Sequence, residues 1–234
     1  MGPECNPTFE TNLINNIIMT EAEIRELENQ LGCPNGEIGI EVGKTMNETN
    51  IGMTSSSIDF LNIQNKNSIL ELGHGNCSHL DQLLDFAENI RYFGLEISET
   101  MHLESKKLNA KKEADFRLYE GETIPFGNNH FDRIMSVNTI YFWTNPLKVI
   151  HEIERTLKQD GFCVITFANK DFMEKLPFVG DKFQLYNESD IKELVKNSNL
   201  KIIESKENTE LVKSKTGDHV ERKYTLVKLS KKSQ

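Results

Sequence analysis

The chain has 234 residues, a formal net charge of −9 and a sequence pI near 5.3, a size that suits one domain. This acidic balance argues against nucleic acid as a partner, because such complexes depend on many phosphate contacts. No apolar run approaches the ~20 residues needed to span a bilayer, and the N-terminus lacks the basic start and apolar core of a signal peptide. We therefore expect a cytoplasmic protein without a membrane partner.

The first 62 residues are predicted to be helical. Residues 1–19 carry little pattern and are expected to be disordered. The sequence Thr20-Glu21-Ala22-Glu23 is a capping box, and Gly32 is the expected stop of the helix that starts there. A second helix is predicted from about residue 37 through residue 46, and a third over roughly 56–61.

From residue 68 onward, predicted strands and helices alternate along the chain. The strands are expected near 68–72, 91–96, 115–119, 131–137, 162–168, 200–205 and 221–229. The helices are expected near 77–89, 98–110 and 146–158, with a further one starting at Ser189. This alternation predicts a parallel sheet with helices on both faces, as in Rossmann-like, doubly wound α/β proteins.

The junction after the first predicted strand carries the clearest functional signal. The apolar run from Ser68 to Leu72 contains Glu71 and continues into Gly73-His74-Gly75. Glycines allow the backbone to turn tightly and to approach a ligand closely. About twenty residues later a second apolar run ends at Glu96, whose carboxylate can accept hydrogen bonds from both hydroxyls of a ribose.

Two further motifs follow in order, one from Glu120 through Phe126 and one from Phe131 through Asn138. This ordered set resembles the class I S-adenosylmethionine-dependent methyltransferases, in the broad small-molecule branch with an acid-small-x-x-Leu-Pro-Phe motif. The resemblance spans about residues 68–168. It implies a seven-stranded, mostly parallel sheet with the last strand antiparallel, in a core over 63–234. It also implies that the helical segment 1–62 forms a lid over the cofactor.

The resemblance assigns S-adenosylmethionine as the cofactor and predicts which residues contact it. These are Glu71, Gly73, Gly75, Glu96, Ile97, Glu120, Gly121 and Asn138. Each of the three acids has a second interpretation, which for Glu96 is a solvated strand end. Glu71 either attracts the positive charges of the cofactor or caps local backbone amides. Glu120 either accepts from the adenine amino group or is an ordinary surface acid.

Cys77 departs from the family pattern, which has a third glycine at this position. Its side chain either crowds the methionine part of the cofactor or is tolerated at the start of the following helix. The other three cysteines, Cys5, Cys33 and Cys163, show no metal-binding spacing with it, so no metal is expected.

Candidate residues on the acceptor side come from two segments outside these motifs. Asn47 and Asn50 are three residues apart, so a continuous helix would place them on one face, although asparagine also suits helix ends. Tyr141 and Trp143 follow the fourth strand and either line the acceptor pocket or pack in the core. The apolar insert 171–186 either helps to enclose the acceptor or packs a small helix onto the core.

The expected reaction is direct, in-line transfer of a methyl group to a small molecule by a monomer or homodimer. One alternative is a noncatalytic protein that binds S-adenosylmethionine or S-adenosylhomocysteine. Another is a nicotinamide-dependent oxidoreductase, although its GxGxxG motif requires a glycine where Ser78 stands.

Overall fold

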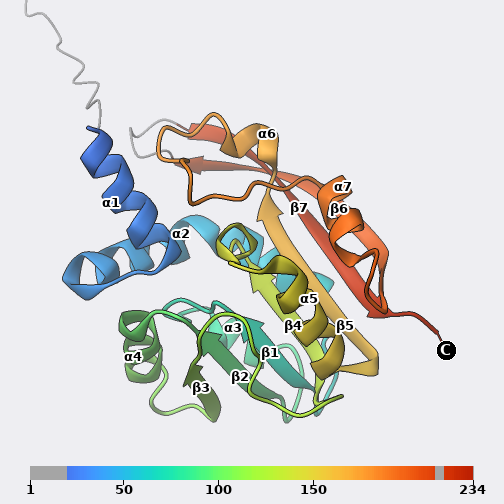
Figure 1. Ribbon diagram of the computed structural model, residues 1–234. Coiled ribbons are helices and arrows are strands. Elements are labelled where there is room, and N and C mark those ends of the chain that lie inside the picture. Colours follow the sequence, from blue (N-terminus) through green and yellow to red (C-terminus); the bar gives the residue numbers. More distant parts are fainter. Residues whose placement is uncertain (1–19, 214–218, 234) are drawn as a thin grey trace, which may run out of the picture.

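The computed structural model describes residues 20–213 and 219–233, which form a seven-stranded sheet flanked by helices (Figure 1). The expected disorder of residues 1–19 lies outside the described part. In chain order the strands are β1 (Ser68–Leu72), β2 (Arg91–Glu96), β3 (Ala114–Leu118), β4 (Phe131–Val137), β5 (Leu157–Ala168), β6 (Leu200–Lys213) and β7 (His219–Lys231). Their order across the sheet is β3-β2-β1-β4-β5-β7-β6.

Strands β1 to β5 pair in parallel, whereas β7 is antiparallel to both of its neighbours, β5 and β6. This topology confirms the expected Rossmann-like fold with an antiparallel last strand. The order reverses between β1 and β4, because the chain moves outward from β1 to β3 and then returns to the other side of β1. Such a switch point opens a crevice at the carboxyl ends of the two strands.

Helices cover both faces of the sheet (Figure 1). They are α1 (Glu21–Gly32), α2 (Gly36–Phe60), α3 (Leu80–Leu84), α4 (Glu99–Leu108), α5 (Pro146–Thr156), α6 (Lys170–Met173) and α7 (Glu188–Val195), with a 3-10 turn η1 (Ile140–Phe142). Buried side chains of α5 and α7 share one core cluster with Leu70 and Ile165. Those of α2 and α3 share a second cluster with Ile69 and Tyr92 on the opposite face.

Helix α2 corrects the prediction of two separate helices, since it runs unbroken over 25 residues from Gly36 to Phe60. Tertiary packing outweighs the weak helix propensity of this stretch. A Cβ on Gly43 would lie 2.5 Å from the sulfur of Met101, so glycine allows α4 to approach α2 closely. Further along, Met53 and Ile58 are fully buried against the sheet. The run 46–50 therefore lies inside a helix, and the helix-end interpretation of its asparagines is wrong.

Other element boundaries also differ from the prediction. The helix expected over 77–89 is reduced to α3. Its first turn is lost because Cys77 takes a left-handed backbone conformation with φ of +50° that a helix cannot contain. The helix expected to end at 158 ends at Thr156, and β5 starts at Leu157. Strands β6 and β7 form a longer hairpin than predicted, with paired residues on both sides of the undescribed segment 214–218.

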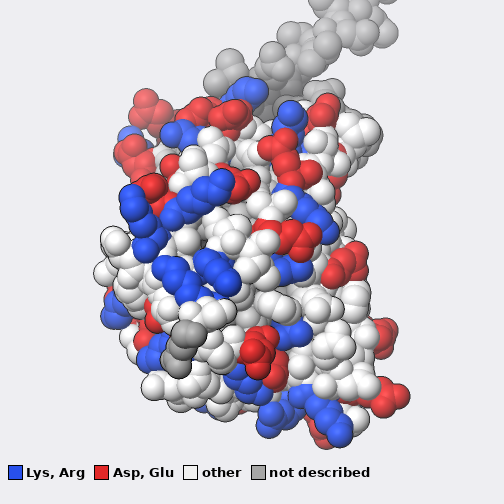
Figure 2. Space-filling model, turned by 90° about the vertical axis from the view of Figure 1, so that its right-hand side faces the viewer, with Lys and Arg blue, Asp and Glu red and all other residues white. Residues whose placement is uncertain are grey.

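The surface of the C-terminal hairpin carries mixed charge. Figure 2 shows basic and acidic side chains interspersed on this side of the molecule. Glu204, for example, pairs with Lys228 at 3.0 Å and with Lys206 at 3.4 Å. In the part of the chain that the structure describes, no helix has the length and apolar character required to cross a membrane.

Candidate functional site

The predicted glycine loop lies at the crevice between β1 and β4. Gly73 has a φ of +71°, and a Cβ there would lie 2.4 Å from the Thr139 side chain. The loops that follow β1 and β4 are therefore in contact at Gly73. Gly75 also has a left-handed φ of +58°, but a Cβ there would meet no atom within 4 Å. Glycine at this position leaves open space beside the loop, where a ligand can approach the backbone.

Glu96 links this loop to the end of β2. Its Oε2 accepts a hydrogen bond from the Gly75 amide at 2.9 Å, and its Oε1 accepts from the amides of Ile97 at 2.8 Å and Ser98 at 2.9 Å. Only 5% of its surface is exposed. A carboxylate offers about four acceptor positions, so these three bonds leave one position on Oε2 for a ligand hydroxyl.

Ile97 and Gly121 lie together next to Glu96. The Ile97 side chain is 38% exposed, and a Cβ on Gly121 would lie 3.3 Å from its Cγ2 atom. Gly121 has a φ of +90°, which favours glycine. The structure thus brings an accessible apolar side chain and a glycine backbone beside the Glu96 carboxylate. An adenosine fits this combination, because its ribose carries hydroxyl donors and its base has an apolar face.

Glu120 is exposed, and its Oε1 accepts a hydrogen bond from the Thr123 amide at 2.7 Å. The carboxylate therefore stabilises its own turn. This bond fits the interpretation of a surface acid, and the adenine contact stays a prediction.

Glu71 lies in a buried polar cluster beneath the loop. Its Oε2 accepts hydrogen bonds from the Tyr92 hydroxyl at 2.6 Å and from His79 Nε2 at 2.9 Å. Burial raises the pKa of Glu71, but the charge and hydrogen bonds of its neighbours lower it overall. Burial lowers the pKa of His79, but the negative charge of Glu71 and the hydrogen bond to it raise that pKa overall. The two side chains thus form a buried ion pair, so Glu71 bonds to side chains and does not cap the local backbone amides.

Cys77 belongs to the same cluster. Its thiol is fully buried and lies 3.2 Å from the Tyr92 hydroxyl. The ligating atoms of Glu71, Cys77 and His79 lie within 4.8 Å of one another, the spacing of a potential metal site, although Glu71 and His79 bond directly to each other. Because the thiol packs against β2, the structure supports tolerance at this position and not crowding of the open side of the loop.

A second polar network joins three predicted residues at the end of β4. Asn138 has a φ of +56°, and its Nδ2 donates to Asn50 Oδ1 at 3.0 Å. The Tyr141 hydroxyl donates to Asn138 Oδ1 at 3.0 Å. Arg222 of β7, which sequence analysis missed, also donates to Asn50 Oδ1 at 3.0 Å. Asn47 has no side-chain hydrogen bond to the described residues.

The two aromatic candidates, Tyr141 and Trp143, lie in the core cluster beside α5, with 2% and 5% of their surfaces exposed. Their burial fits the interpretation of core packing. Phe142 between them is half-buried and packs against Phe183 with ring centroids 4.7 Å apart and the ring planes tilted by 58°. Gly32 at the end of α1 packs against the same ring, since a Cβ there would lie 3.1 Å from it.

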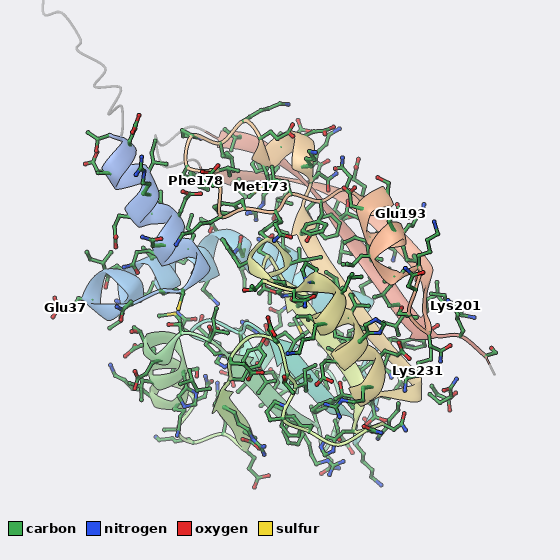
Figure 3. All side chains as sticks on the ribbon, viewed as in Figure 1. Glu37, Met173, Phe178, Glu193, Lys201 and Lys231 are labelled. Carbon is green, nitrogen blue, oxygen red and sulfur yellow. The ribbon has the colours of Figure 1, made fainter. Side chains whose placement is uncertain are left out.

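The N-terminal helices contact both sides of the crevice. On one side, the Ser98 hydroxyl donates to the Pro34 carbonyl, and the Gly36 amide donates to Thr100 at 3.1 Å. On the other, the buried Glu28 accepts from the Gly180 amide at 2.8 Å. Figure 3 shows Met173 and Phe178 on the segment that this bond ties to α1.

The turn between α1 and α2 lies near Glu96. Burial raises the pKa of the Cys33 thiol, and the negative charge of Glu96 raises it further. The Pro34 carbonyl of this turn accepts from the Ser98 hydroxyl, and the Ser98 amide donates to Glu96 at 2.9 Å, so the turn is close to the predicted ribose site. Among the contacts that sequence analysis missed, those of Glu28 and Arg222 join segments 152 and 172 residues apart, and no local motif marks them. His79 lies only eight residues after its partner Glu71.

Comparisons with known proteins agree with this geometry. Residues 70–165 match the family of methyltransferase domains. The Bacillus subtilis protein YdaC, described as an uncharacterised methyltransferase, is 30% identical over 132 residues, which cover 55% of this chain and 71% of YdaC.

Solved structures share the fold at low sequence identity. One is a chain from the complex between the Haloferax volcanii Trm112 methyltransferase activator and a methyltransferase, with a TM-score of 0.68 and 16% identity over 83% of this chain and 95% of that one. Another is an S-adenosylmethionine-dependent methyltransferase from Aquifex aeolicus, with a TM-score of 0.58 and 15% identity over 90% and 98% of the two chains. The relationship to YdaC shows that the chain belongs to the methyltransferases, and the solved structures show that it has the fold of the S-adenosylmethionine-dependent class.

Proposed function

We propose that this protein transfers a methyl group from S-adenosylmethionine to a small-molecule acceptor. The observation that carries the proposal is the open space beside Gly75, with the free acceptor position of Glu96 next to it. Ile97 and Gly121 complete a surface that suits adenosine. Bound S-adenosylmethionine supplies an activated methyl group on its sulfonium, so the protein need not generate the electrophile.

In this proposal the residues of the chain bind and orient the reactants. Gly73 and Gly75 let the backbone approach the cofactor, and Glu96 holds its ribose. Glu120 and Asn138 are proposed at the adenine and methionine ends. Placing the acceptor in line behind the methyl group can lower the barrier by roughly 7–11 kcal/mol through proximity and orientation. Direct displacement then needs no covalent intermediate with the enzyme.

The N-terminal segment 1–62 is proposed as a lid on the core 63–234. Its described helices reach Ser98 and Thr100 on one side of the crevice and Gly180 on the other. An acceptor that enters between them would be enclosed by α2, η1 and the segment 171–186. This enclosure supports a small molecule over a macromolecule. The acidic net charge also argues against nucleic acid as the substrate.

Calorimetric titration with S-adenosylmethionine, S-adenosylhomocysteine and NAD tests the cofactor. We expect the first two to bind and NAD not to bind, and the reverse would support the oxidoreductase alternative. A screen of soluble metabolites with methyl-labelled cofactor then tests the acceptor. Labelled small molecules would support the proposal, whereas labelling of protein or nucleic acid alone would overturn it. Cofactor binding without transfer to any class would favour a noncatalytic binding protein.

A further inference from the structure

The network around Asn138 has a fixed hydrogen-bond direction. At one end, the Ala168 backbone amide lies 3.2 Å from Asn138 Oδ1. A backbone N–H can only donate, so the Asn138 oxygen must face Ala168 and its NH2 group must face Asn50. The Tyr141 hydroxyl donates to the same Asn138 oxygen.

The other end of the network imposes the same direction. The Arg222 guanidinium has five N–H donors and no acceptor, and it lies 3.0 Å from Asn50 Oδ1. Asn50 Oδ1 therefore accepts from Arg222 and from Asn138 at once. If the oxygen and nitrogen of the Asn50 side-chain amide were exchanged, its NH2 group would face two donors, those of Asn138 and Arg222. The Asn50 NH2 group must point away from the network, and it donates to no acceptor among the described residues.

Arg222 is itself held firmly in place. Only 7% of its surface is exposed, and it donates to the Thr49 carbonyl at 2.6 Å and to Glu210 at 2.7 Å. Glu210 packs against Gly52, where a Cβ would lie 2.1 Å from its Oε2. The C-terminal hairpin thus grips the middle of α2, and Arg222 fixes the direction in which Asn50 presents its donors.

The location of these donors indicates their ligand. Asn138 follows β4 at the switch point, and the next residue, Thr139, contacts Gly73 of the glycine loop. This is the end of the crevice opposite Ile97 and Gly121, where an adenosine fits. The amino-acid end of the cofactor, with its carboxylate, would then lie next to Asn50.

We propose that the Asn50 NH2 group binds the methionine carboxylate of the cofactor and that Arg222 is a positioning residue that orients it. The inference rests on the proposed cofactor. Asn47, one turn earlier on α2 and also half-buried, is near enough to add a second amide.

An isosteric substitution separates this role from a structural one. In Asn50→Asp, a carboxylate oxygen still accepts from Asn138 and Arg222, but the free donor group becomes a negatively charged acceptor. The control is Asn65→Asp at an exposed site before β1, where Oδ1 accepts from the Glu88 amide at 3.0 Å. Both variants add one negative charge, and both keep the oxygen that is used in the fold.

Calorimetry on the full chain measures the affinity of each variant for S-adenosylhomocysteine and for 5′-methylthioadenosine, which lacks the amino-acid part. Asn50→Asp should weaken S-adenosylhomocysteine roughly 10- to 100-fold, as expected for loss of a hydrogen bond to a charged group. It should leave 5′-methylthioadenosine unchanged, and Asn65→Asp should change neither ligand. Arg222→Met should also weaken S-adenosylhomocysteine more than it weakens 5′-methylthioadenosine. Lys223→Met, at the exposed neighbouring residue, should not change the relative affinity for the two ligands.

Equal weakening of both ligands would assign Asn50 a purely structural role and overturn the inference. An unchanged affinity of Asn50→Asp for S-adenosylhomocysteine would overturn it as well, while leaving the proposed function intact. Failure of the unmodified protein to bind either ligand would instead refute the proposed cofactor.

Discussion

Replacement of Cys77 by alanine and by glycine tests how the loop accommodates a side chain where the family has glycine. The Cys77 backbone is fixed in the left-handed region, because its amide donates to the His74 carbonyl and its carbonyl accepts from Asn109. The thiol is buried against Tyr92. Alanine removes the sulfur and keeps the backbone strain, whereas glycine removes both.

The two effects can be estimated from this geometry. Loss of the buried sulfur should cost about 0.5–1.5 kcal/mol for packing and about 0.5–1 kcal/mol for its hydrogen bond in either variant. Relative to alanine, glycine should cost a further ~0.8 kcal/mol because a buried methyl group is lost. It should also cost ~0.5–1 kcal/mol because the unfolded chain has more conformational freedom. Relief of the left-handed strain returns about 1–2 kcal/mol. The glycine and alanine variants should therefore be about equally stable.

Urea unfolding of the four variants at Cys77 and Cys163 measures this balance. Cys163 is a buried residue of β5 with ordinary strand backbone, so glycine there should be less stable than alanine by about 1–2 kcal/mol. If the glycine variant at Cys77 were also less stable than the alanine variant by about 1–2 kcal/mol, backbone strain at Cys77 would be refuted. The affinity for S-adenosylhomocysteine should stay within about twofold, or ~0.4 kcal/mol, in both Cys77 variants, because the thiol lies outside the crevice. Tighter binding by the glycine variant would instead show that the thiol crowds the ligand.

Two other predictions concern the buried acids. Glu96→Ala should weaken S-adenosylhomocysteine binding by about 1–3 kcal/mol, and an unchanged dissociation constant in the folded variant would exclude the ribose contact. For His79, the pKa is raised in the folded state, so the Glu71 pair stabilises the protein fully below about pH 6.5 and less as the pH rises through the folded value. The unfolding free energy of the unmodified protein relative to His79→Gln should thus decline as the pH rises above about 6.5, and a constant difference would contradict the ion pair.

The fold was largely predictable, because strand positions and their alternation with helices are local signals. All seven strands occur near their predicted positions, and the antiparallel last strand follows from the family resemblance. The errors arise where tertiary contacts decide the local structure. Burial of Met53 and Ile58 against the sheet lets α2 continue through a sequence with weak helix propensity. The left-handed Cys77 delays the start of α3, although the sequence of this segment has helical periodicity.

The candidate site was predictable only where its residues adjoin strand ends. Gly73, Gly75 and Glu96 could be located because the carboxyl ends of parallel strands lie at one edge of the sheet. Arg222 could not, since its partner Asn50 is 172 residues away in the chain. The sequence shows Arg222 only as an arginine in a predicted strand, and this local pattern does not identify the partner of its side chain.

Glu71 and Glu96 show why one sequence pattern leads to two structural roles. Both acids follow an apolar run, and their side chains lie on the same face of the sheet, because Glu71 pairs with Gly94, two residues before Glu96. Glu71 precedes the last residue of β1, so its carboxylate remains under the loop and requires buried partners. Glu96 is the last residue of β2, one position beyond the pairing with β1, and therefore reaches the amides at the rim of the crevice. The position of an acid relative to the strand end, to within two residues, decides whether it supports the loop from below or faces a ligand.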